Sequence, residues 1–148
     1  METSQYDSPR YTENEFLNQL KSRLPGLNDE RALAWAAAAI KHLAQQLDDG
    51  PRNELINALP PRCKAEVLKG GNIVKLFGKE PPQDFFVDVT DDAGWKPSEL
   101  GSRKTVVNAL SVVRDHLPSD QALDIERDLP PNVAKIWREA ASPNMERD

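Results

Sequence analysis

The feature that most constrains the fold of this 148-residue chain is a Leu-Pro-Pro segment that occurs twice. The copies are Leu59-Pro60-Pro61 and Leu129-Pro130-Pro131, so the offset is 129 − 59 = 70 residues. The same offset pairs apolar residues far upstream and matches residues that favour helix N-termini. The pairs are Phe16 with Phe86, Asn28 with Ser98, Ala39 with Ala109, Ile40 with Leu110, Leu43 with Val113, Leu47 with Leu117, Asp49 with Ser119, Leu55 with Ile125, and Val67 with Trp137. Such self-similarity predicts two copies of one structural unit.

The first copy contains the signals of four helices. Thr12 and Glu15 form a capping box that begins the first helix. Asn28 caps a long alanine-rich helix, and alanine on many of its sides indicates that other helices surround it. Asp49 caps a short helix, which ends where Pro60 disfavours the helical conformation of the preceding residue. The expected helices span about residues 12–24, 28–47, 49–59 and 61–70.

The second copy repeats these signals in the same order. Pro82 begins a helix that carries Phe85 and Phe86, and Ser98 caps the equivalent of the long helix. There β-branched residues replace the alanines, so we expect bulkier side chains to fill the core. Ser119 caps the next helix, and a last helix follows Pro130-Pro131.

These signals predict an all-α helical bundle of about eight helices in two four-helix halves. We expect a disordered N-terminal tail over residues 1–10, a first helical repeat over 11–70 and an ordered crossover over 71–81. A second helical repeat over 82–141 and a frayed C-terminal tail over 142–148 follow. The two repeats should form one compact domain, because a half of about 60 residues is only marginally stable alone.

Composition argues against several classes of function. The net charge of −5, without a run of Lys and Arg, argues against a nucleic-acid partner. A single cysteine cannot form an internal disulfide and is typical of a reducing compartment. No apolar run approaches membrane-spanning length, and the polar N-terminus has no signal-peptide core. We therefore expect a cytoplasmic monomer or weak homodimer that binds neither nucleic acid nor membrane.

The order of these segments resembles the prokaryotic family known as domain of unknown function 2267. The matching segments are Phe16-Leu17, residues 32–47 and Leu59-Pro60 in the first copy, and Phe86-Val87, residues 103–117 and Leu129-Pro130 in the second. The resemblance covers about residues 11–141, nearly the whole expected fold. It implies an all-helical cytoplasmic protein without an assigned activity, and it supplies no catalytic residues.

Cys63, His42 and His116 are the residues whose chemistry is most relevant to catalysis. Cys63 lies near a helix start, where a thiolate is favoured, but its repeat partner Val133 indicates a buried apolar position. The offset of 70 does not pair the two histidines with each other. No other His, Cys or carboxylate lies at a spacing from them that is typical of metal ligands. We expect no catalytic, cofactor or metal site, with the histidines at the surface or at helix ends.

Two aromatic residues are candidates for binding a partner. Trp95 follows Gly94 in a loop, and Phe77 lies in the crossover between the halves. Aromatic side chains on loops often anchor protein partners. For Trp95 the alternative is a lid over the core of its own half, whereas Trp137 should lie in the core.

The sequence therefore favours a non-enzymatic protein-interaction or adaptor module. The alternative is a small-ligand-binding bundle with a pocket between the halves, near Ala36, Ala37 and Leu110. An enzyme that uses Cys63 or a histidine, and a nucleic-acid-binding protein, are the less favoured possibilities.

Overall fold

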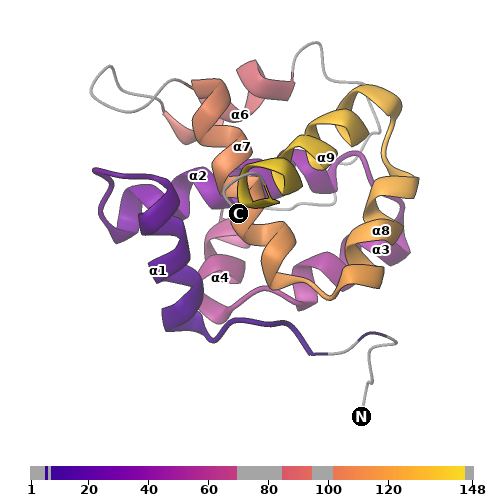
Figure 1. Ribbon diagram of the computed structural model, residues 1–148, viewed down its shortest axis with the longest axis horizontal. Helices are drawn as coiled ribbons and strands as arrows, with labels where there is room; N and C mark the ends of the chain where they lie inside the picture. Colours follow the sequence, from indigo (N-terminus) through magenta and orange to yellow (C-terminus); the bar gives the residue numbers. More distant parts are fainter. Residues whose placement is uncertain (1–5, 7, 70–84, 95–101, 146–148) are drawn as a thin grey trace.

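The computed structural model describes residues 6, 8–69, 85–94 and 102–145, which form eight α-helices (Figure 1). In the first half α1 spans Glu13–Arg23, α2 Asp29–Ala44, α3 Asp49–Asn57 and α4 Pro61–Lys69. In the second half α6 spans Phe85–Ala93, α7 Ser102–His116, α8 Ser119–Asp128 and α9 Pro131–Met145. These described residues contain no strand, and the predicted all-α helical bundle is confirmed.

The first two helices begin at the predicted caps. The Thr12 hydroxyl accepts a hydrogen bond from the Glu15 N–H at 3.2 Å, and the Glu15 carboxylate accepts one from the Thr12 N–H at 2.9 Å. The Asn28 side chain accepts a hydrogen bond from the Arg31 N–H at 2.9 Å. Each cap satisfies backbone donors that a helix start otherwise leaves unpaired.

Two predicted caps are wrong by one residue. Asp48 holds the N-cap position of α3 and Pro118 that of α8, so Asp49 and Ser119 are the first helical residues. The carbonyls of Asp48 and Pro118 already accept the first helical hydrogen bonds, each at 3.0 Å. The predicted cap Ser98 lies outside the described residues. The two helix starts are nevertheless 118 − 48 = 70 positions apart.

The helices α2 and α7 form the centre of the bundle. α2 contacts α1, α4, α6 and α7, which confirms the prediction that other helices surround it. α7 in turn contacts α1, α2, α6 and α9. The first helix of each half also packs on the long helix of the other half, α1 on α7 and α6 on α2. Each of these contacts in one half therefore has an equivalent contact between the corresponding helices of the other half.

Polar contacts reinforce this crossing of the halves. Arg23 at the end of α1 forms an ion pair with Asp115 of α7 at 2.7 Å, and the Asn108 amide of α7 donates to the Arg23 carbonyl at 3.0 Å. In the reciprocal place, Arg31 of α2 donates to the Ala93 carbonyl at the end of α6, at 2.8 Å. The C-terminal carbonyls of α1 and α6 are thus bound by side chains of the opposite half.

Burial follows the offset of 70 from α2 onward. Equivalent buried pairs are Ala39 with Ala109, Ile40 with Leu110, Leu43 with Val113, Leu55 with Ile125, Leu59 with Leu129, Cys63 with Val133 and Val67 with Trp137. In α6, however, the buried residues follow those of α1 by 69 positions, as in 85 − 16 = 69. Phe85 is buried and Phe86 only partly buried, so the predicted pairing of Phe16 with Phe86 is one residue off. The duplication itself stays a prediction.

Several expected boundaries differ from the observed ones. α2 ends at Ala44, and a tight turn, in which the Leu47 N–H donates to the Ala44 carbonyl at 3.1 Å, still carries Leu47 into the core. α9 runs to Met145, past the expected end at residue 141. The crossover expected over residues 71–81 and the helix start expected at Pro82 lie outside the described residues.

Candidate functional site

Both residues predicted to bind a partner, Phe77 and Trp95, lie outside the described residues. The other two tryptophans are fully buried, and the prediction that Trp137 belongs to the core is confirmed. The Trp137 indole N–H donates to the Ala122 carbonyl at 3.0 Å, which joins α9 to α8. Trp35 lies in the core on α2.

The structure places Cys63 in the core. Its side chain is 1% exposed, beside Val67 on the inner face of α4. Burial, with a smaller contribution from the Glu66 carboxylate, raises the pKa of the Cys63 thiol to about 12. The thiol is therefore protonated near neutral pH, and the predicted role as a small buried hydrophobic side chain is confirmed.

His116 is the last residue of α7 and is buried, so the prediction of a surface or helix-end histidine is correct only in its second part. Its Nδ1 accepts a hydrogen bond from the Tyr11 N–H at 3.1 Å, and its Nε2 lies 2.9 Å from the Ala58 carbonyl oxygen. A carbonyl only accepts, so Nε2 carries the proton and the ring is neutral. Burial lowers the pKa of His116, and the hydrogen bond to Ala58 opposes that change to a smaller extent.

His42 is partly buried in the last turn of α2 and joins two helices. Its Nε2 lies 3.1 Å from the Asp92 carboxylate of α6, which also pairs with Lys41 at 3.3 Å. The two contacts bind α2 to α6 across the halves. Among the residues that the structure describes, no three His, Cys, Asp or Glu side chains are arranged to hold a metal ion.

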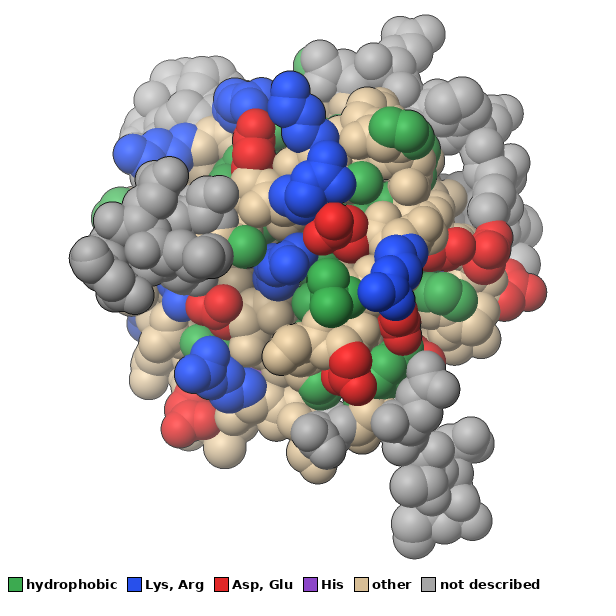
Figure 2. All heavy atoms as spheres, turned by 45° about the vertical axis from the view of Figure 1, so that its right-hand side comes forward, with side chains coloured by type: hydrophobic (Ala, Val, Ile, Leu, Met, Phe, Trp, Pro, Cys, Tyr) green, Lys and Arg blue, Asp and Glu red, His purple; other side chains and the backbone are tan. Residues whose placement is uncertain are grey.

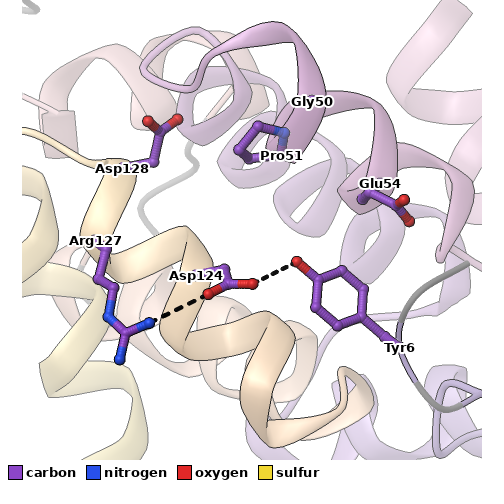
Figure 3. Close-up of a pocket in the computed structure, with 7 residues that line it drawn as sticks. All are labelled: Tyr6, Gly50, Pro51, Glu54, Asp124, Arg127 and Asp128. Carbon is purple, nitrogen blue, oxygen red and sulfur yellow. Dashed lines mark hydrogen bonds and ion pairs between the residues drawn. The ribbon is translucent and has the colours of Figure 1, made fainter.

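A hollow of about 480 Å³ opens between α3 and α8 (Figure 3). We call it the α3–α8 hollow and define it by the residues that line it. Gly50, Pro51 and Glu54 come from α3, Asp124, Arg127 and Asp128 come from α8, and Tyr6 comes from the segment before α1. The hollow lies where α3 of the first half contacts α8 of the second half.

The hollow is acidic, and its carboxylates accept hydrogen bonds. Asp124 accepts one from the Tyr6 hydroxyl at 2.6 Å and one from the Arg127 guanidinium at 3.4 Å. Asp128 accepts from the Asp48 N–H at 2.7 Å, at the start of α3. Together with Glu54, the lining contains three carboxylates and one guanidinium. This composition favours hydrogen-bond donors and cations.

Two further hollows lie where α7 meets α8. They have volumes of about 730 and 400 Å³ and share the lining residues Arg10, Asp115, Leu117 and Ser119. Ser8 lines the larger one. Residues that were expected in a disordered tail thus line surface hollows beside α8, as Tyr6 does.

The sequence reasoning missed the residues of the α3–α8 hollow. One signal for two of them was available, because Glu54 and Asp124 are 124 − 54 = 70 positions apart and carry the same charge. No comparable signal marks Tyr6, which lies in a polar stretch typical of a mobile terminus. Its position follows from a contact between residues 118 positions apart.

A comparison with models of known protein families finds no family that matches the chain, and a search of curated proteins finds no match either. In the part of the chain that the structure describes, no helix combines the length and the apolar character needed to cross a membrane.

Proposed function

We propose that this protein is a non-enzymatic interaction module that binds a protein partner through the α3–α8 hollow. The observation that carries the proposal is the position of Tyr6. A side chain from an N-terminal segment reaches a surface hollow between two other helices and donates a hydrogen bond to Asp124 there. A surface that accepts one segment of polypeptide in this way has the polar groups and the open shape needed to accept another.

The roles of the chemically reactive side chains support this proposal. The Cys63 thiol is buried and its pKa is raised, while both ring nitrogens of His116 bind backbone groups. These residues contribute to packing and to the attachment of the chain near Tyr11. An interaction module needs only a stable scaffold and an accessible surface, and these side chains support the scaffold.

The surface around the hollow favours a polar partner. Figure 2 shows acidic and basic side chains interleaved over this side of the molecule, with hydrophobic side chains between them. Glu126 pairs with Arg114 at 3.8 Å and with Arg138 at 3.3 Å, and Arg103 pairs with Glu139 at 3.0 Å. Among the residues that the structure describes, the large exposed hydrophobic ones lie on three different helices: Leu68 on α4, Val87 on α6 and Leu123 on α8. Recognition would then depend on charge and hydrogen bonding more than on one apolar face.

Affinity purification from the native host tests the proposal. A protein recovered with the wild type should be lost from the Asp124→Asn variant. Glu66→Gln is the matched control, because Asp124 and Glu66 are 40% and 36% exposed and each pairs with a basic residue three positions later. Recovery of the same proteins by both variants, or of none by the wild type, would refute the proposal.

The second candidate function is a small-ligand-binding bundle. A volume of about 480 Å³ is within the range of small-molecule sites. The expected location is different, however, because Ala36, Ala37 and Leu110 are buried and line none of the three hollows described above. Native mass spectrometry of protein from its host distinguishes the two, since a ligand adds a small increment to 16.6 kDa and a partner adds a protein-sized one.

The remaining expectations belong to the same proposal. We propose a cytoplasmic monomer or weak homodimer that does not bind nucleic acid, on the basis of the single cysteine and the net charge of −5. Membership of the family domain of unknown function 2267 is likewise a proposal, which rests on the segments quoted above.

A further inference from the structure

Residues 8–11, which precede α1 and which we call the strap, are attached to the rest of the protein through His116. The Arg10 N–H donates to the His116 carbonyl at 2.7 Å, and the Tyr11 N–H donates to His116 Nδ1 at 3.1 Å. The Tyr11 ring also stacks on the imidazole, with centroids 5.9 Å apart. Within the described part of the chain, the hydrogen bonds and ring contacts that join the strap to other segments all end on His116. A change at this one residue therefore affects the attachment of the whole strap.

The hydrogen bonds at the two ring nitrogens require a neutral imidazole. The Tyr11 N–H only donates, so Nδ1 must accept, whereas the Ala58 carbonyl, 2.9 Å from Nε2, only accepts, so Nε2 must carry the proton. A second proton would bind to Nδ1, and the new N–H would point at the N–H of Tyr11. The bond to Ala58 would remain, because Nε2 still donates. Protonation therefore breaks the bond to the strap and keeps the bond to the end of α3.

The charged side chains near the ring do not compensate a positive charge on it. The nearest titratable side chains on the elements that contact the ring are Arg10 and Tyr11 on the strap, Glu13 and Glu15 on α1, Glu54 on α3, which lines the α3–α8 hollow, and Asp115 on α7. Glu13 and Glu15 accept hydrogen bonds from backbone N–H groups, and Asp115 pairs with Arg23 at 2.7 Å. Among the described residues, no carboxylate forms an ion pair with His116. Burial accordingly lowers the pKa of His116 while the strap is in place.

We propose that His116 is a pH-sensitive latch: its neutral ring holds residues 8–11 against the end of α7, and protonation of Nδ1 in acid releases them. Ser8 and Arg10 line the hollow of about 730 Å³ where α7 meets α8, and Arg10 also lines the smaller one beside it. Release therefore removes one wall of these two hollows and uncovers the start of α8. His116 does not line the α3–α8 hollow, so the latch acts on a second surface and does not depend on the proposed function.

Amide hydrogen exchange followed by NMR on the full chain tests the latch. The protection factor compares the exchange rate of an amide with that of the unfolded chain at the same pH. For the Tyr11 amide it should fall about tenfold or more between pH 7.5 and 5, because the hydrogen bond to Nδ1 is lost. Protection of the Ile40 amide, in the core of α2, should stay unchanged over this range. The side-chain nitrogen shifts of His116 should report protonation of the ring over the same pH range as the fall at Tyr11.

His116→Asn is the matched variant, because its side-chain oxygen can accept from the Tyr11 N–H and does not titrate. Tyr11 protection in this variant should not depend on pH, whereas His42→Asn should keep the fall seen in the wild type. Circular dichroism establishes that each variant is folded, and the wild-type comparison of Tyr11 with Ile40 stands even without a folded His116→Asn. Three results would overturn the latch: unchanged Tyr11 protection between pH 7.5 and 5, a fall that persists in His116→Asn, or an equal fall at Ile40, which would indicate global unfolding.

Discussion

At the scale of single residues, His116 contacts three separate parts of the chain, and no pattern in the sequence indicates these contacts. Its ring stacks on Tyr11 with centroids 5.9 Å apart and meets Phe16 edge-on at 5.2 Å. It also binds the Ala58 carbonyl at the end of α3. Sequence analysis missed this role because all three partners lie more than 50 positions away and only the fold brings them together.

Protonation of His116 should therefore destabilise the protein. The pKa of His116 is lowered in the fold, so between that value and the ordinary 6.5 the unfolded chain binds more protons than the folded one. Stability from this residue is complete above pH 6.5 and declines as the pH falls through the lowered pKa.

Urea unfolding of wild type and His116→Asn between pH 7.5 and 5 measures this contribution. The wild type should lose stability more steeply than the variant as the pH falls below 6.5, since carboxylate titrations are common to both. His42→Asn, which changes the partly buried histidine at the contact between α2 and α6, is the control. Equal slopes for wild type and His116→Asn would show that the His116 ring does not act in this way.

At the scale of elements, local chemistry could be predicted where one residue determines the backbone. The capping box at Thr12, the cap at Asn28 and the helices that begin at Pro61 and Pro131 all agree with the sequence signals. The starts of α3 and α8 were displaced by one residue because acidic and hydroxyl side chains suit the first turn as well as the cap. The register of α6 could not be predicted, because two adjacent phenylalanines leave open which one faces the core.

Thr12→Ala should destabilise the protein by about 1 kcal/mol, because it removes one bond of the capping box and leaves a backbone N–H of α1 without its partner. Ser22→Ala is the control in the same helix, where the hydroxyl donates to the Gln19 carbonyl at 3.3 Å and its loss should change stability by less than about 0.5 kcal/mol. Urea unfolding at pH 7.5 measures both. Equal effects of the two variants would argue against a specific capping contribution.

At the scale of the whole molecule, the halves depend on one another. α1 packs on α7 and α6 on α2, and side chains of one half bind the terminal carbonyls of the other. The sequence predicted two halves that share a core, but it contained no sign that their first helices cross over. The α3–α8 hollow escaped prediction for the same reason, because it is formed by residues from both halves and from the segment before α1.

Fragments of the chain should therefore not fold alone. Residues 1–70 and 71–148, expressed separately, should each show low helicity and no cooperative melting by circular dichroism, since the long helix of each would lack the opposite half. Mixing the fragments should restore helicity, because their contacts are reciprocal. Cooperative melting of residues 1–70 alone would contradict this interdependence.

The most direct measurement on the proposed binding surface is site-specific photo-cross-linking in the native host. A photoreactive amino acid would replace Arg127 on the rim of the α3–α8 hollow or, as the control, Lys69 at the end of α4. Both side chains are 74% exposed and pair with an acidic residue three positions earlier. We predict a cross-linked protein adduct from position 127 and none from position 69. Equal labelling from both positions, or none from position 127, would contradict the assignment of the hollow as the partner-binding surface.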